Sequence, residues 1–91
     1  MDNNYRYEIF KDYGTISERV DSLGNKWFKK LRLISWNGRQ PLLDVREWSA
    51  DDNICRSGMR FNFHEIEVLG SLIDTIRETN NDREETAVGR A

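Results

Sequence analysis

The stretch that decides the fold is WFKKLRLISWNGRQPLLDVREW, which spans residues 27–48. Its two runs, Trp27–Trp36 and Leu42–Trp48, alternate apolar and polar residues with the period of two that is typical of strands. Between them, Asn37-Gly38 tolerates positive φ at both central positions of a tight turn. The stretch therefore predicts a β-hairpin, with Pro41 at the start of the second strand, where its missing N–H costs least.

The two faces of this hairpin differ in chemistry. One face carries aliphatic residues, which suit a core: Leu31, Leu33, Leu43 and Val45. The opposite face carries cations and tryptophans: Arg32, Trp36, Arg46 and Trp48. Because both strands sort their residues consistently when they pair across the tight turn, we expect this register and this division of faces.

Weaker signals extend the sheet on both sides of the hairpin. Residues 5–18 are rich in β-forming residues around a glycine and predict a strand or a bent hairpin, while Glu18–Asn25 predicts a loop. After the polar, turn-prone loop Ser49–Ser57, the segment Gly58–Phe61 predicts a short fourth strand. The expected fold class is α+β, a four-stranded curved antiparallel sheet followed by one C-terminal helix.

The predicted helix covers about Phe63–Thr79. Asn62 is a typical N-cap, and Glu65 three residues later completes a capping box. An apolar stripe recurs at helical spacing: Ile66, Leu69, Leu72, Ile73 and Ile76. Because a sheet of four strands has only this helix to cover it, we expect part of the stripe to form a dimer interface. Residues 1–79 are then one domain, and residues 80–91, which lack periodicity, a disordered tail.

Charge is segregated along the chain. Residues 24–48 hold six cations against two carboxylates, whereas residues 49–80 hold three cations against six carboxylates. A basic stripe on a protein whose net charge is −2 points to a local anionic partner.

Composition argues against several other classes of protein. The only cysteine, Cys55, excludes an internal disulfide, and neither it nor the only histidine, His64, has the partners of a metal site or a catalytic triad. Turn chemistry accounts for Asp51-Asp52. We expect no catalytic residue, no metal or other cofactor and no small-molecule substrate. No apolar run approaches the roughly 20 residues of a membrane span, so we expect no membrane partner and an intracellular protein, cytoplasmic or nucleoid-associated.

The tryptophan-bearing face has two explanations. A tryptophan on a sheet surface can stack on any base, and neighbouring Lys and Arg side chains neutralise phosphates. Alternatively, Trp36 and Trp48 are ordinary core residues beside a solvated basic face. Since the leucine-bearing face already provides a core, the pattern favours the nucleic-acid explanation.

The run Trp27–Ile73 resembles the single-stranded-DNA-binding domain of the eukaryotic transcriptional coactivator positive cofactor four, and more closely the short bacterial YdbC-like proteins of that family. The resemblance rests on "SWNGR" ending a basic strand, on "LLDVREW", and on "GMRFNFHEIEVLGSLI", where the family has a glycine, a short strand, a helix cap and an apolar helix. It implies a homodimer packed through its helices, with curved sheets that form channels for single strands.

The resemblance also implies roles for single residues. Trp36 matches an aromatic residue that stacks on bases, and Arg46 a basic residue that faces the nucleic acid. Trp48 matches an aromatic residue at its strand's end, while Arg39 and Arg56 lie near basic positions of the hairpin turn and of the segment before the glycine. The loop before the glycine departs from the family, where it is often rich in lysine or proline.

We therefore predict a protein without enzymatic activity that binds single-stranded DNA or RNA with little sequence preference, in transcription regulation or other DNA transactions. The residues predicted to contact nucleic acid are Lys26, Lys30, Arg32, Trp36, Arg39, Arg46, Trp48 and Arg56. One alternative is a protein–protein interaction module that uses the basic sheet and the acidic side of the helix. Another is a family member that retains only dimerisation.

Overall fold

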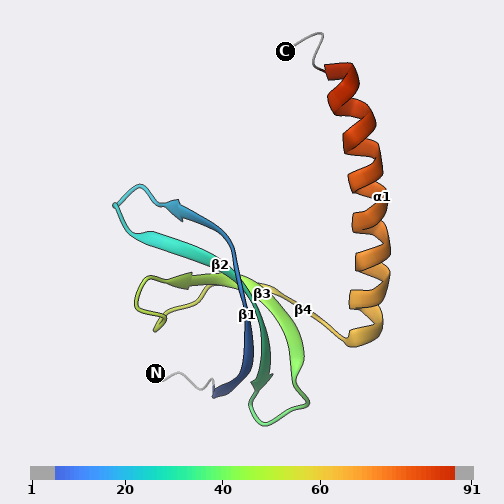
Figure 1. Ribbon diagram of the computed structural model, residues 1–91. Helices are drawn as coiled ribbons and strands as arrows, with labels where there is room; N and C mark the ends of the chain where they lie inside the picture. Colours follow the sequence, from blue (N-terminus) through green and yellow to red (C-terminus); the bar gives the residue numbers. More distant parts are fainter. Residues whose placement is uncertain (1–5, 88–91) are drawn as a thin grey trace.

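Four strands precede a single long helix in the computed structural model, which describes the backbone of residues 6–87 and the side chains of residues 6–80 (Figure 1). The elements are β1 (Tyr7–Val20), β2 (Lys26–Trp36), β3 (Leu42–Ser49), β4 (Met59–Phe61) and α1 (Phe63–Ala87). The strands form one antiparallel sheet in the order β1-β2-β3-β4. The predicted α+β architecture is confirmed.

The central hairpin forms as its sequence predicts. Asn37 and Gly38 adopt φ values of 55° and 74°, and the Arg39 backbone N–H donates a hydrogen bond to the Trp36 carbonyl at 3.0 Å. The register is the expected one, because β2 and β3 pair Leu31 with Val45. The division of the hairpin into two chemically different faces is therefore confirmed.

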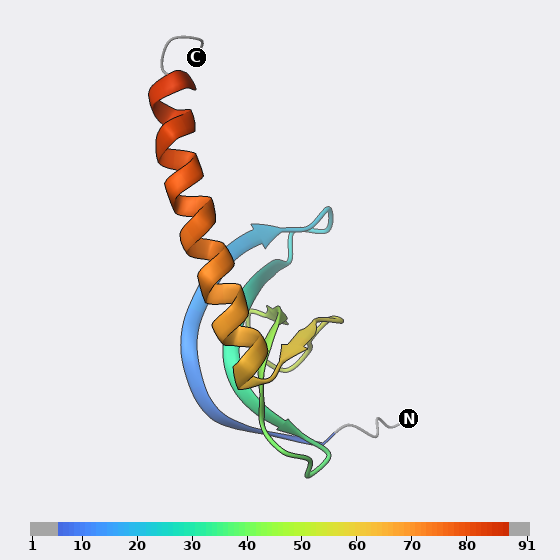
Figure 2. The ribbon, with the colours of Figure 1, turned by 90° about the vertical axis from the view of Figure 1, so that its right-hand side faces the viewer.

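The edge strand β1 is one bent strand, not a hairpin. Its pairing with β2 shifts at three points, each of which leaves one apolar residue of β1 outside the register and exposed: Phe10, Tyr13 and Ile16. Bulges of this kind bend a strand and increase its twist. They let β1 run on to Val20, through part of the predicted loop, and they curve the sheet (Figure 2).

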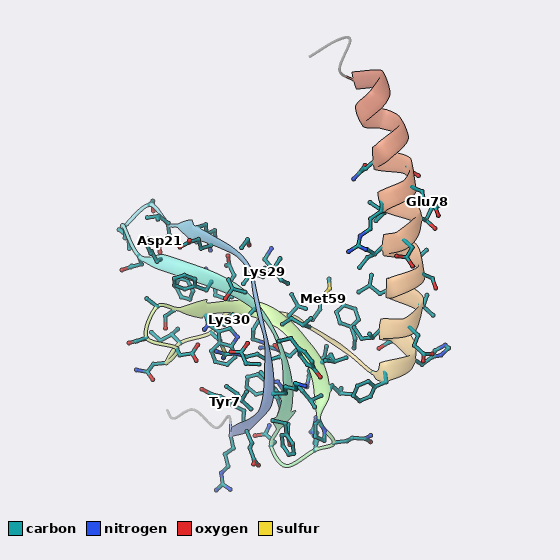
Figure 3. All side chains as sticks on the ribbon, viewed as in Figure 1. Tyr7, Asp21, Lys29, Lys30, Met59 and Glu78 are labelled. Carbon is teal, nitrogen blue, oxygen red and sulfur yellow. The ribbon has the colours of Figure 1, made fainter. Side chains whose placement is uncertain are left out.

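The curvature gives the sheet a convex and a concave face. α1 stands on the convex side, where Met59 of β4 points toward it (Figures 1 and 3). Met59 pairs with Val45, so the aliphatic face of the β2–β3 hairpin is the convex face. The cation- and tryptophan-bearing face is the concave one.

The tryptophans of the concave face are buried, which corrects one expectation. Trp48 and Ile34 are 1% exposed and Trp36 is 8% exposed, and together they form the hydrophobic core, with Cys55 packed against them. The prediction that Trp36 and Trp48 lie open at the surface is therefore wrong. Its cause is the curvature, which brings Tyr7 and the loop after β3 over the tryptophans.

The start of α1 is confirmed and its predicted end is wrong. The Asn62 side chain accepts a hydrogen bond from the Glu65 N–H at 2.7 Å, and the Glu65 carboxylate accepts one from the Asn62 N–H at 2.9 Å. The helix continues beyond Thr79 to Ala87, so residues 80–87 are helical. The last part of the predicted tail, residues 88–91, lies outside the described residues.

Among the described elements, α1 comes close only to β3 and β4. The Cα radius of gyration is 16.9 Å, whereas a compact domain of this length would have about 12 Å. The long helix therefore leaves the sheet instead of folding down over it (Figure 1).

Candidate nucleic-acid interface

A fully buried carboxylate organises one half of the concave face. Asp44 is 0% exposed and accepts the Trp36 indole N–H at 3.0 Å. It also accepts two hydrogen bonds from the Arg46 guanidinium, both at 2.7 Å. This guanidinium lies 4.5 Å from the centroid of the Trp36 ring. Burial alone would lower the pKa of Arg46, but the hydrogen bonds and charge of Asp44 outweigh it and raise that pKa.

A second charged cluster occupies the other half. The Arg32 guanidinium lies 4.9 Å from the centroid of the Trp48 ring, and the residue is only 3% exposed. Its Nε donates to Asp12 at 3.1 Å and its Nη2 to Asp52 at 2.8 Å. Lys30 Nζ donates to the other Asp52 oxygen at 3.2 Å. Protein carboxylates therefore already neutralise two of the cations predicted to contact phosphate.

Two arginines without a carboxylate partner in the described part of the chain lie at the hairpin end of the concave face. A hollow of about 460 Å³ opens there. Its lining includes Trp36, Cys55 and four arginines, namely Arg39, Arg46, Arg56 and Arg60. Among the residues that the structure describes, the guanidinium groups of Arg39 and Arg60 form no ion pair and no hydrogen bond. No carboxylate lines this hollow, so its field is positive.

The charged groups of the remaining predicted cations lie away from the hollow. Arg56 contributes to the wall of the hollow, but its guanidinium group lies 4.1 Å from the centroid of the Trp27 ring, and its Nε lies 4.0 Å from the Glu47 carboxylate. Lys26 is exposed and lies 3.9 Å from Glu18. Of the eight residues predicted to contact nucleic acid, four line the hollow, and Lys26, Lys30, Arg32 and Trp48 do not. Lys30 belongs to the concave face, and its neighbour Lys29 leaves β2 on the opposite side (Figure 3).

Two residues of the site were not predicted from the sequence. Tyr7 of β1 is 41% exposed, and its ring centroid lies 5.1 Å from that of Trp36 and 5.5 Å from that of Trp48. Arg60 pairs with Asp44 across β3 and β4, which aligns it with the concave face. The sequence contains a feature that could have indicated each residue. Tyr7 is an aromatic residue near the start of the β-rich run 5–18, and Arg60 is a cation inside the short fourth strand.

The predicted dimer residues are largely uncovered in the single chain. Ile66 and Leu69, near the start of α1, are partly buried. Farther along the helix, Leu72, Ile73 and Ile76 are exposed. The apolar stripe therefore runs past the end of the surface that the sheet of the same chain covers.

Other kinds of site find no support within the described part of the chain. Residues 6–80 contain no group of three or more His, Cys, Asp or Glu side chains that could hold a metal ion. The described helix is too polar to cross a membrane. Cys55, a free thiol, contributes to the wall of the arginine-lined hollow.

Comparison with known proteins places the chain among relatives. No established family profile matches it. A protein of Treponema pallidum (strain Nichols), named only as an uncharacterized protein, is 33% identical over 76 residues, which are 84% of this chain and 85% of that protein. At this identity, and with nearly the whole of both proteins aligned, the chain belongs to the same family as the Treponema pallidum protein.

Proposed function

We propose that the chain binds single-stranded DNA or RNA on its concave face with little sequence preference, in transcription or other nucleic-acid transactions, and that it acts by binding alone. The observation that carries this proposal is the arginine-lined hollow. Four arginines contribute to its lining, and the guanidinium groups of two of them, Arg39 and Arg60, form no ion pair or hydrogen bond among the described residues.

The chemistry of the hollow fits a phosphate chain better than a single small anion. Guanidinium groups grip phosphate oxygens in two-point fashion and release condensed counterions when they do so. The volume of about 460 Å³ exceeds what one phosphate needs, and Trp36, which lines the hollow, has its ring centroid 5.1 Å from that of Tyr7. A backbone phosphate and its neighbouring sugar fit such a space, with the strand continuing along the concave face.

The accessible aromatic rings differ from those expected from the sequence. Trp36 and Trp48 are buried, so they support the site instead of stacking on bases. Tyr7 is exposed on top of them, and Phe28 is half-buried farther along β2, beneath Lys30. We assign base stacking to these two rings, each worth about 1–3 kcal/mol of binding free energy.

The test is fluorescence anisotropy of a labelled oligothymidine titrated with the protein at several salt concentrations. Arg39→Ala/Arg60→Ala removes the two unpartnered guanidinium groups without breaking an ion pair. We expect binding to weaken at least about tenfold, because each lost charge-assisted contact costs about 1.5–3 kcal/mol. The slope of log affinity against log salt should fall by about 0.7 for each lost phosphate contact.

A matched double variant separates local contacts from net charge. Lys29→Ala/Arg77→Ala removes the same charge from the convex face and from α1. Screening over these distances should limit its effect to about threefold or less. Equal losses in the two double variants, or no binding by the unmodified protein, would contradict the proposal. Tight binding to an acidic peptide without oligonucleotide binding would instead select the protein-interaction module.

We further propose that the chain works as a homodimer joined through α1. Two observations support this proposal: the extended shape of the single chain and the exposed half of its apolar helix stripe. Apolar residues of the convex side also lie uncovered, among them Met59 at 67% exposure. Exposed apolar residues on both of these elements are typical of an interface.

A further inference from the structure

The loop between β3 and β4 folds back over the concave face. Ser49 and Ile54 exchange backbone and side-chain hydrogen bonds, with the Ser49 N–H donating at 2.8 Å and the Ile54 N–H donating to Ser49 Oγ at 3.0 Å. Asp51 stays within the loop, where it accepts from Ser49 Oγ at 2.6 Å and from the Asn53 N–H at 3.1 Å. These bonds close the loop on itself and fix the direction of the next carboxylate, Asp52.

Asp52 leaves the loop and reaches the sheet. It adopts a left-handed φ of 67°, which is unfavourable for an L-residue other than glycine but is tolerated by Asp and Asn. In this conformation its two oxygens divide between two cations, Lys30 at 3.2 Å and Arg32 at 2.8 Å. A phosphate bound by the same ammonium and guanidinium groups would occupy the position that this carboxylate occupies.

The same spot holds buried donors that the protein leaves unused. Arg32 Nη1 and the Trp48 indole N–H are both buried and have no hydrogen-bond partner among the described residues. They belong to side chains that stack on each other. Buried donors are nearly always paired in folded proteins. Asp52 already uses its oxygens on Lys30 and on Arg32 Nη2, so an anion with more acceptor oxygens would satisfy this cluster better.

We propose that Lys30, Arg32 and the indole N–H of Trp48 form a second phosphate site on the concave face, and that Asp52 occupies this site in the free protein as an internal anion that a nucleic-acid phosphate displaces. This inference rests on the proposed function and deepens it. The hollow at the hairpin end receives the strand first, and displacement of Asp52 extends the bound segment along β2. Asp52 thereby sets both the affinity and the length of the site.

The side chain of Asp52 is accessible to a competitor. It is 39% exposed, whereas that of Arg32 beneath it is 4% exposed. An incoming phosphate therefore meets the carboxylate first, and Lys30 Nζ and Arg32 Nη2 become available when the loop moves away, while Arg32 Nε stays bonded to Asp12.

The experiment compares two neighbouring carboxylates of one loop. Asp52→Asn removes the internal anion and keeps a residue that accepts positive φ, whereas Asp51→Asn removes the same charge from a side chain that contacts neither cation. Oligothymidine affinity is measured by anisotropy across salt concentrations. We expect Asp52→Asn to bind about tenfold more tightly and to steepen the salt slope by about 0.7 for each added phosphate contact. Asp51→Asn should gain about threefold or less.

A double-mutant cycle with Lys30 ties the gain to the cation pair. Lys30→Met should weaken binding little while Asp52 holds the ammonium group, but should remove much of the gain in the Asp52→Asn background. Circular dichroism verifies the fold of each variant, and Asp52→Gly, which suits the backbone still better, replaces Asp52→Asn if that variant does not fold.

The possible outcomes distinguish failure of the internal-anion proposal from failure of the proposed function. Equal gains in the two loop variants, or an equal effect of Lys30→Met in both backgrounds, overturns the internal-anion proposal while leaving oligonucleotide binding intact. Absence of binding in every variant, including those that lack Asp52, overturns the proposed function itself.

Discussion

The concave face of the sheet and the helix on its other side are built in opposite ways. On the concave face, tryptophans are buried, a buried carboxylate has several donors and cations stack on aromatic rings. On α1, apolar residues such as Leu72 and Ile76 are exposed, and the helix leaves the sheet after its first turns. The difference shows that the single chain covers only one of its two apolar surfaces from solvent.

This contrast separates stability from assembly. The concave side provides the core that holds the four strands together, so substitutions there should affect folding. The helix stripe provides surface that one chain cannot cover, so substitutions there should affect association. The two regions can therefore be tested independently.

The largest expected effect comes from truncating the concave core. Trp48→Ala should lower the free energy of unfolding by about 3–5 kcal/mol, because it removes the largest fully buried side chain and the ring under Arg32. Leu72→Ala, its counterpart on the exposed helix, should change the stability of the dilute monomer by about 0.5 kcal/mol or less. Urea titrations followed by circular dichroism measure both. Similar losses for the two variants would erase the distinction between the regions.

The sequence predicted the parts of this contrast that depend on local signals. Asn37-Gly38 defined the hairpin, the alternation of leucines and cations defined its register, and Asn62 with Glu65 defined the helix start. Each signal lies within a few residues and is governed by backbone preference or side-chain period.

The burial of the concave tryptophans could not be read in the same way. It depends on three bulges in β1 and on a loop that folds back from β3. A two-residue period describes a regular strand and therefore indicates neither of these features. The leucine-bearing face was expected to be the core because the alternation of residues carries no information about this curvature. The end of α1 was predicted too early because it was placed where the apolar stripe stops. The stripe shows how far the helix has an apolar face, whereas the helical backbone continues beyond it.

A smaller effect should appear in the concentration dependence of stability. If α1 joins two chains, a tenfold rise in protein concentration should add about 1.4 kcal/mol to the free energy of unfolding of a dimer. Ile76→Asp should abolish this dependence by placing a charge in the apolar stripe. Thermal unfolding at several concentrations, with sedimentation of the same samples, measures the effect.

Ser71→Asp is the matched control for the helix. It adds the same charge at an exposed position away from the stripe, next to the acidic side of α1, and should keep the concentration dependence. A melting temperature of the unmodified protein that does not change with concentration would contradict assembly through α1.

The smallest effect concerns acid, and it should again distinguish the two regions. Burial alone would raise the pKa of Asp52, but the hydrogen bonds from Arg32 and Lys30 outweigh it and lower that pKa below its ordinary value of 3.8. The unfolded chain then binds the proton more readily than the folded chain. The stabilisation is full above the ordinary pKa and disappears as the pH falls through the lower value of the folded state. The melting temperature should therefore fall between about pH 5 and pH 3, and less steeply in Asp52→Asn.

Asp74→Asn provides the contrast on the helix, because the Asp74 carboxylate is exposed and forms no ion pair or hydrogen bond within the described residues. Its pH profile should follow that of the unmodified protein. The hydrogen bond from Arg19 similarly lowers the pKa of Glu47, so some acid sensitivity should persist in Asp52→Asn. If Asp52→Asn and Asp74→Asn flatten the pH profile equally, the ion pairs of Asp52 with Lys30 and Arg32 stabilise the fold no more than the exposed Asp74 carboxylate does. Its assignment as an internal anion would then lose its energetic basis.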